Sequence, residues 1–118
     1  MASIEDLVSF FKKKGERNLD RIQIYIYFAD LYRAKWRGEF FDSIKWVWNG
    51  VQPFSKEIEA AFLQEGDPEK LSESVQRILR DIYIESFGNT CQELINRVME
   101  MAPFRGRSFS SGEQIFFF

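Results

Sequence analysis

The stretch NLDRIQIYIYFADLYRAKWRG, residues 18–38 of a chain of 118 residues, decides the fold. Its apolar and aromatic side chains recur at helical spacing and predict a helix from about Leu19 to Trp36. The β-branched residues would also suit a strand, but a run this long without a turn signal favours a helix. A helix that is apolar on most sides is usually the central one of a small bundle. Its apolar stripe consists of Leu19, Ile22, Ile26 and Ala29, widened by Tyr25, Phe28, Leu31 and Tyr32.

Capping residues predict the first and the last helix of the chain. Ser3 followed by Asp6 resembles a capping box, and Gly15 ends the first helix. Thr90 followed by Glu93 forms a second capping box that opens the last helix. The side of the last helix that we expect to face the core carries Cys91, Leu94, Ile95, Val98 and Met99.

Two helices are expected between these ends and after the central stretch. Ser55 caps one of them, and Gly66 ends it. Asp67 is an N-cap with Pro68 at the first helical position, and this pair predicts one continuous helix up to Gly88.

The segment EFFDSIKWVWNGVQP, residues 39–53, supports two interpretations. Its β-forming residues partly alternate, as in a short strand, but Asp42 or Ser43 could equally cap a short helix. Asn49 and Gly50 are a turn signal because both tolerate positive φ. Pro53 then removes a backbone hydrogen-bond donor.

Two tryptophans in this segment also leave two alternatives open. Trp46 and Trp48 lie two residues apart, so they share a face on a strand and diverge on a helix. In one alternative at least one ring is exposed near the turn, where tryptophan is a favoured interface residue. In the other, both rings belong to the core.

The chain as a whole predicts a mainly α fold. It contains no internal repeat, linker or low-complexity tract, so we expect a single helical domain over residues 1–118. We expect a compact bundle of about five to six helices, with one or two short strands near residues 40–52 and 113–118 as an alternative. The C-terminal IFFF either packs on the core or forms an exposed tail.

The composition limits the cellular locations and the kinds of partner that we expect for the protein. The net charge of −2 argues weakly against duplex DNA, and an aromatic content of 17% suggests that some rings are exposed contact sites. Cys91 is the only cysteine, which fits a reducing compartment. The N-terminal charges follow the apolar residues, the reverse of a signal peptide, and no apolar run approaches the ~20 residues of a membrane span. We therefore expect a cytoplasmic protein without a membrane partner.

The residue types present make catalysis an unfavourable hypothesis. The chain has no histidine, so the commonest general base and the commonest metal ligand are missing. Neither of the glycine-rich phosphate-binding motifs occurs. We expect no enzymatic activity, no metal site and no cofactor. The carboxylates that remain have the spacing of solvated helix faces: Glu57, Glu59, Asp81 and Glu85.

One basic group supports an alternative function. Arg33, Lys35 and Arg37 alternate with Trp36, an interleaving that single-stranded nucleic acid uses. The plainer explanation is a solvated helix end. The alternative function is a nucleic-acid-binding regulator of viral or mobile-element origin, with these cations as its contacts.

The order of motifs along residues 25–62 resembles a known family. YFADLY is followed by a glycine, by aromatic residues, and then by Gly50-Val51-Gln52-Pro53 and FSKEIEAAF. This order is similar to the Panacea (SocA-like or GepA-like phage-associated) antitoxin domain family, with a looser echo at LINRVMEMAPF and GEQIFFF. This chain departs from the family in two residues inserted into its Tyr-Gly-Pro motif and in Phe104 at the tryptophan of its Pro-Trp motif.

The resemblance implies a mostly helical, non-enzymatic module that binds a protein partner. Panacea-type proteins act in toxin–antitoxin systems, where they neutralise a toxin or deliver it to a protease, and others occur in phage genomes. By this resemblance the partner is a toxin or host protein, and a homodimer is a further alternative. We expect the binding surface at the turn and beside it: Trp46, Trp48, Asn49, Gly50, Pro53 and Phe54, with Tyr32 and Trp36 nearby.

Overall fold

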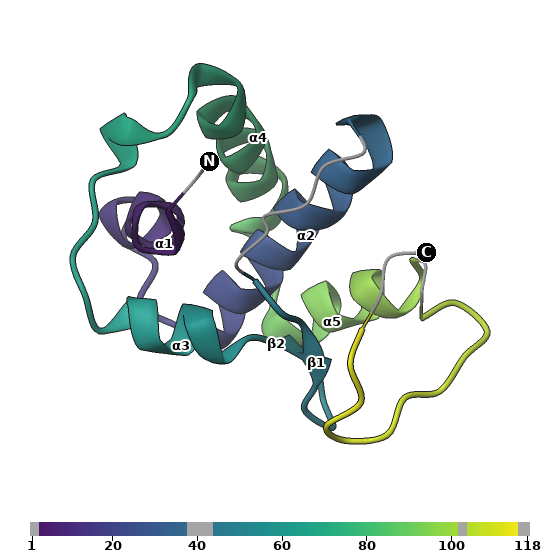
Figure 1. Ribbon diagram of the computed structural model, residues 1–118. Helices are drawn as coiled ribbons and strands as arrows, with labels where there is room; N and C mark the ends of the chain where they lie inside the picture. Colours follow the sequence, from purple (N-terminus) through teal and green to yellow (C-terminus); the bar gives the residue numbers. More distant parts are fainter. Residues whose placement is uncertain (1–2, 38–43, 102–103, 116–118) are drawn as a thin grey trace.

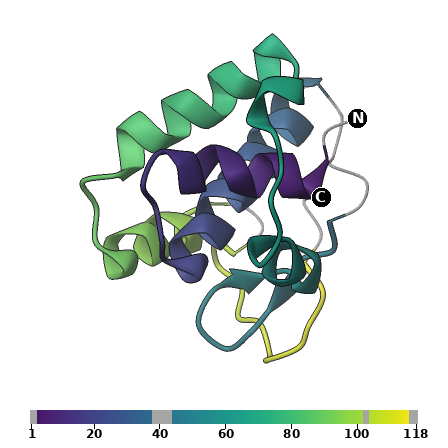
Figure 2. The same cartoon turned by 90° about the vertical axis from the view of Figure 1, so that its left-hand side faces the viewer.

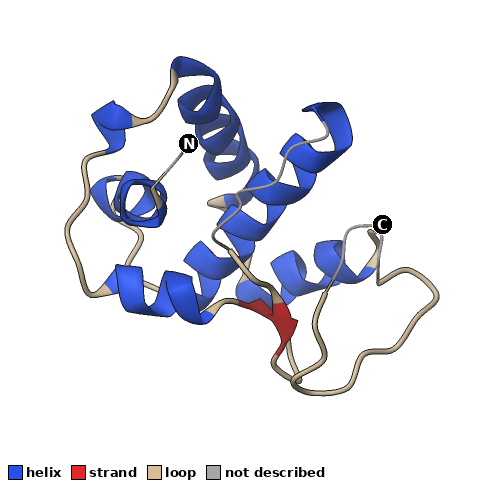
Figure 3. Ribbon diagram, in the orientation of Figure 1, coloured by secondary structure: helices blue, strands red, loops and turns tan. Residues whose placement is uncertain are grey.

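The computed structural model describes residues 3–37, 44–101 and 104–115, without the side chains of residues 33–37. These residues form five α-helices, a short 3₁₀ helix and a two-stranded sheet, which confirms the mainly α fold class (Figure 1, Figure 3). The elements are α1 Ile4–Lys13, α2 Leu19–Arg37, β1 Val47–Trp48, β2 Pro53–Phe54, α3 Lys56–Phe62, η1 Pro68–Lys70, α4 Glu73–Ser86 and α5 Cys91–Met99.

Helix α2 is the centre of the fold, as its sequence predicts. It contacts the four other α-helices and β2, and it crosses the middle of the molecule (Figure 1). Every residue from Ile22 to Leu31 is buried, including the polar Gln23 and Asp30. A helix needs apolar residues on all sides when neighbours cover all of them. The burial of α2 therefore explains the composition of the stretch that decides the fold.

The capping box expected at Ser3 and Asp6 is wrong. The Ser3 side chain bonds to the Glu5 carboxylate at 2.6 Å and caps no backbone group of α1. Asp6 is buried and accepts a hydrogen bond from the backbone N–H of Asp67 at 2.7 Å. The carboxylate that would cap its own helix thus holds the distant loop between α3 and η1, because that loop lies directly against α1.

Gly66 permits this close approach. A Cβ atom at Gly66 would lie 2.3 Å from the carbonyl oxygen of Glu5. The backbone N–H of Gly66 instead donates to Ser9 Oγ at 2.8 Å. The glycine that the sequence marks as a helix stop is therefore also a contact point between α1 and the loop.

The continuous helix expected from Asp67 to Gly88 is interrupted. The N-cap at Asp67 is confirmed, but it opens only η1. Leu71 is extended, with ψ of 146°, and buries its side chain against the core. Ser72 then caps α4 by accepting from the backbone N–H of Val75. A second local cap and the burial of Leu71 together favour a break over the continuous helix.

The remaining expectations for the helices hold with two exceptions, which are the end of α3, at Phe62 and not at Gly66, and the position of Met99. Ser55 caps α3, and Thr90 with Glu93 forms the capping box of α5. Leu94 and Val98 face the core, and Cys91 and Ile95 are half-buried. Met99 was expected to face the core, but it is exposed at the C-terminal end of α5.

The small sheet is an antiparallel pair extended by the C-terminal segment. Val47 lies opposite Phe54, and Trp48 lies opposite Pro53. On the other side of β1, Gln114 lies opposite Val47, and the Trp48 N–H donates to the Glu113 carbonyl at 2.8 Å. The expected strand near residues 40–52 is present at Val47–Trp48, whereas the described residues near 113–118 form only an isolated bridge at Gln114.

The C-terminal IFFF is described only at its first residue. Ile115 is buried, and its N–H donates to the Trp46 carbonyl at 2.9 Å. This start of the segment packs on the core. Phe41, Pro103 and residues 116–118 lie outside the described part of the chain.

Candidate functional site

The hairpin of residues 46–54 buries both of its tryptophans. Trp46 is 3% exposed and Trp48 is 9% exposed, so the alternative in which one ring is exposed near the turn is wrong. Trp46 donates its indole N–H to the buried Asp30 carboxylate at 2.8 Å. Its ring meets Tyr27 edge to face, with centroids 5.2 Å apart. A partnered indole N–H lets the whole ring lie in the core without an unsatisfied donor.

Phe104 lies at the centre of an aromatic layer formed with Trp48, Tyr27 and Phe109. Its ring centroid lies 5.1 Å from Trp48, 6.1 Å from Tyr27 and 4.7 Å from Phe109. Phe104 is only 1% exposed. The residue that stands at the family's tryptophan position in the resemblance is therefore a core residue here.

Two buried glutamines fasten the hairpin to α2. The Gln23 side chain donates to the Ser55 carbonyl and accepts from the Ser55 N–H, both at 2.9 Å. Gln52 donates to the carbonyl of Asp20 at 2.9 Å. Sequence reasoning missed both residues, although a glutamine inside the apolar run of α2 is the signal of a buried polar contact. These bonds hold β2 and the start of α3 in a fixed position on α2.

The turn between the strands is closed by Asn49. Its side-chain oxygen accepts from the backbone N–H groups of Val51 and Gln52 at 2.9 and 2.8 Å. Gly50 has a φ of 100°, as the turn signal predicts, whereas Asn49 does not have positive φ. The tip is exposed, and Val51 keeps 58% of its accessible surface. A rigid backbone thus presents a small apolar tip.

The alternation of the strands divides the expected site residues between two faces. Trp46, Trp48 and Pro53 point into the core, where a partner cannot reach them without unfolding the hairpin. Val47 and Phe54 lie opposite one another on the outer face and are half-buried. Of the other expected residues, Asn49 and Gly50 are exposed and Tyr32 is half-buried. The side chains of Arg33, Lys35, Trp36 and Arg37 lie outside the described residues.

A shallow hollow lies where this outer face meets α3. It has a volume of about 560 Å³ and is lined by Lys45, Val47, Lys56, Glu57 and Ala60. Apolar atoms make up most of its lining, and the two lysines are exposed. Glu57 accepts from the Ser55 hydroxyl at 3.1 Å. An apolar hollow beside two cations suits an apolar side chain with a neighbouring carboxylate.

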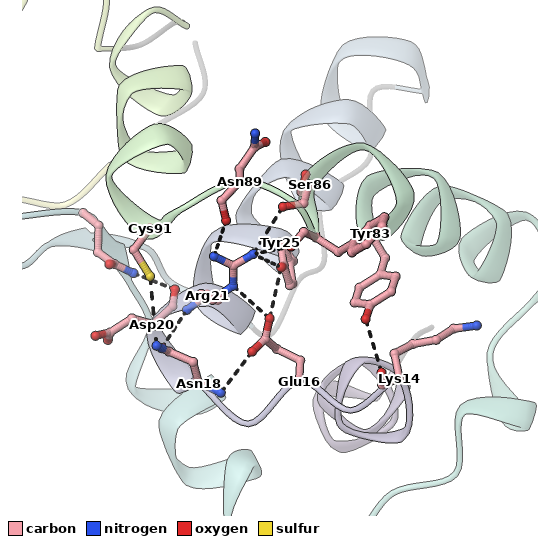
Figure 4. A network of polar contacts seen from close by, with 12 residues as sticks. Lys14, Glu16, Asn18, Asp20, Arg21, Tyr25, Tyr83, Ser86, Asn89 and Cys91 are labelled. Atoms are coloured by element: carbon pink, nitrogen blue, oxygen red, sulfur yellow. Dashed lines mark hydrogen bonds and ion pairs between the residues drawn. The ribbon is translucent and has the colours of Figure 1, made fainter.

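Two basic side chains, Lys12 and Arg21, have structural roles. Lys12 donates to the carbonyls of Phe62 and Gln64 at 2.9 and 3.2 Å, and so satisfies the C-terminal end of α3. Arg21 belongs to a largely buried network between α2 and the α4–α5 turn (Figure 4). These two residues therefore leave the set of cations available to a nucleic acid.

The Arg21 network joins three segments of the chain. Its guanidinium donates to Glu16 Oε1 at 2.9 Å, to the Tyr25 hydroxyl at 2.8 Å and to the Asn89 carbonyl at 2.6 Å (Figure 4). It also donates to the Ser86 carbonyl at 3.2 Å. Burial by itself would lower the pKa of Arg21, but its bonds to Glu16 and Tyr25 raise it overall. The arginine thus acts as a fixed cation that caps the C-terminal end of α4.

Tyr25 makes the stability of the protein depend on pH in the alkaline range. Burial raises the pKa of its phenol from 10.0 to about 12; Arg21 opposes this rise and Glu16 adds to it. The unfolded phenol loses its proton near its ordinary pKa while the folded phenol stays neutral. Stability is therefore complete below that pKa and falls as the pH rises towards 12.

The variant Tyr25→Phe tests this linkage. Its free energy of unfolding should fall less steeply than that of the wild type between pH 10 and 12, because one of the ionising phenols is gone. Burial also raises the pKa of Tyr27, so some dependence remains. Urea denaturation at a series of pH values measures both curves. Curves that run parallel through this window would contradict the assignment.

Comparison with protein-family models, with curated proteins and with solved structures finds no match to this chain. Among the residues that the structure describes, none of the helices is long and apolar enough to cross a membrane. The same residues contain no group of histidine, cysteine, aspartate or glutamate side chains arranged to hold a metal ion. The binding function implied by the resemblance to the Panacea family is therefore taken up as a proposal.

Proposed function

We propose that this chain is a non-enzymatic protein-interaction module that binds its partner on the outer face of the hairpin and α3. The Panacea resemblance suggests the role of an antitoxin or a proteolytic adaptor, with a toxin or a host protein as partner. The single cysteine supports a cytoplasmic setting.

One observation carries the location of the site: the apolar hollow between Val47 and Ala60, with Lys45 and Lys56 beside it. The segments that line the hollow are anchored to the core. Trp46 and Trp48 anchor the hairpin, and the hydrogen bond from Gln23 to Ser55 anchors the start of α3. A preorganised surface binds without a large ordering cost. The buried tryptophans thus support the binding surface, while Val47, Phe54 and the exposed tip at Val51 are its contacts.

The test is affinity capture of the tagged chain from its own host, with nuclease treatment, followed by mass spectrometry. We expect one protein partner in stoichiometric amount. The variant Val47→Glu should lose it, because a carboxylate in the apolar hollow would be desolvated on binding. The control Ile84→Glu changes a 60% exposed residue on α4, away from the hairpin and α3, and should retain the partner.

Melting curves of both variants establish that they fold as the wild type does. Equal recovery of the partner by Val47→Glu and by the control would refute the location of the site. Recovery of nucleic acid in place of a protein, removed by nuclease and weakened steeply by salt, would instead support the nucleic-acid-binding alternative.

A further inference from the structure

The outer side of α4 carries an apolar patch that the proposed function does not use. Ile84 and Phe87 are 60% and 62% exposed, and they lie three residues apart on one side of the helix. Phe87 stacks on the half-buried Tyr83, with ring centroids 5.7 Å apart and 19° between the ring planes. Large apolar residues that are fixed and exposed together indicate a contact surface.

Charges of both signs lie beside this patch. Arg77 and Arg80 continue the same stripe towards the N-terminal end of α4, and Asp81 and Glu85 flank it on one side. Within the described part of the chain, Arg80, Asp81 and Glu85 have no ion-pair partner. Arg77 reaches Glu73 only at 3.9 Å, and both side chains are largely exposed. The stripe is therefore cationic in one half and apolar in the other.

We propose that α4 binds α4 of a second copy of this chain, antiparallel, about a twofold axis near Ile82. Reversal of the helix places Arg77 of one copy opposite Phe87 of the other, and Arg80 opposite Ile84. The aliphatic stems of the arginines cover the apolar side chains, and the Arg77 guanidinium faces the aromatic ring. Each pairing occurs twice, as an isologous interface requires.

Charge complementarity is what favours a second copy over another partner. In this register the Arg80 guanidinium lies within reach of the Glu85 carboxylate of the other copy. Arg80 and Glu85 are five residues apart on their own helix, so they are not neighbours within one copy. The stripe and its flank thus supply both the cation and the anion that the reversed copy needs at this position.

This surface is separate from the proposed binding site. Figure 2 shows α4 along the upper edge of the molecule, while α3 and the hairpin lie along the lower edge. A dimer through α4 therefore leaves the hollow at Val47 accessible in both copies. The dimer proposal can therefore be refuted without refuting the proposed partner site, and the partner site can be refuted without refuting the dimer.

Sedimentation equilibrium of the full chain over a series of concentrations tests the dimer. The average mass should rise from 14.0 kDa towards twice that value as concentration increases. Phe87→Lys should weaken association roughly tenfold or more, because it removes the aromatic ring and places a cation opposite Arg77 of the other copy. Leu63→Lys, which introduces the same cation at another exposed apolar residue, should leave association unchanged.

A charge exchange tests the register. Arg80→Glu alone and Glu85→Arg alone should each weaken association, because each brings like charges together across the axis. The double variant Arg80→Glu/Glu85→Arg restores opposite charges and should recover association. A chain that stays monomeric at every concentration would overturn the proposal. So would association that Phe87→Lys leaves intact, or a double variant that associates no better than the single ones.

Discussion

Phe104→Ala should lower the free energy of unfolding by about 3–5 kcal/mol, the usual cost of emptying a fully buried aromatic site. The reason lies in the neighbours of Phe104. Its ring packs against Trp48 and Tyr27 from the core side and against Phe109 from the C-terminal loop. The rigid elements around it, α2 and the hairpin, cannot move into the space that alanine would leave.

Urea denaturation monitored by tryptophan fluorescence measures this loss, since Trp48 contacts the substituted site. Val51→Ala is the matched control. It also shortens an apolar side chain, but at the exposed tip of the hairpin, and should change stability by less than about 0.5 kcal/mol. A loss for Phe104→Ala as small as that of the control would show that the aromatic layer is not part of the core.

Arg21→Ala should cost about 2–4 kcal/mol, because it leaves several groups without their donors at once. The Glu16 carboxylate and the carbonyls of Ser86 and Asn89 all accept from this guanidinium. The side chains of Arg21 and Glu16 are 13% and 15% exposed, so water can replace only part of what is lost. For that reason the expected loss of stability is smaller than for a fully buried ion pair.

The control is Arg77→Ala, which removes an arginine from an exposed pair with Glu73. It should change stability by less than about 0.5 kcal/mol, as exposed ion pairs do. Arg21→Lys adds a second comparison, because a lysine keeps the charge but cannot reach the same carbonyls together. If Arg21→Ala and Arg77→Ala melt alike, the network does not join α4 to α2 as described.

The function proposed for the hairpin uses other residues of the hairpin than its tryptophans. Tryptophans in a turn region suggest interface residues, yet Trp46 and Trp48 are in the core. Both rings find contacts in the core: Asp30 accepts a hydrogen bond from the indole N–H of Trp46, and the Phe104 ring packs against Trp48. The smaller Val47 and the half-buried Phe54 are left for contact with a partner.

Local patterns were sufficient for the N-terminal ends of α3 and α5. The capping residues Ser55 and Thr90 bond to backbone groups three residues away, so the sequence contains both members of each contact. The same reasoning failed at Asp6, whose partner is the N–H of Asp67, far along the chain. It also failed at Leu71, where burial of a side chain breaks a helix that the local sequence would continue.

The sequence by itself determined that α2 would be the central helix of the fold, because its apolar residues lie on most of its sides. It also determined the mainly α class, through the spacing of apolar residues and caps. Only the tertiary structure decided which face of the hairpin is open to a partner. That choice depends on long-range contacts from α2, Phe104 and the segment at Gln114, and the alternation of a short strand alone does not specify which face is covered.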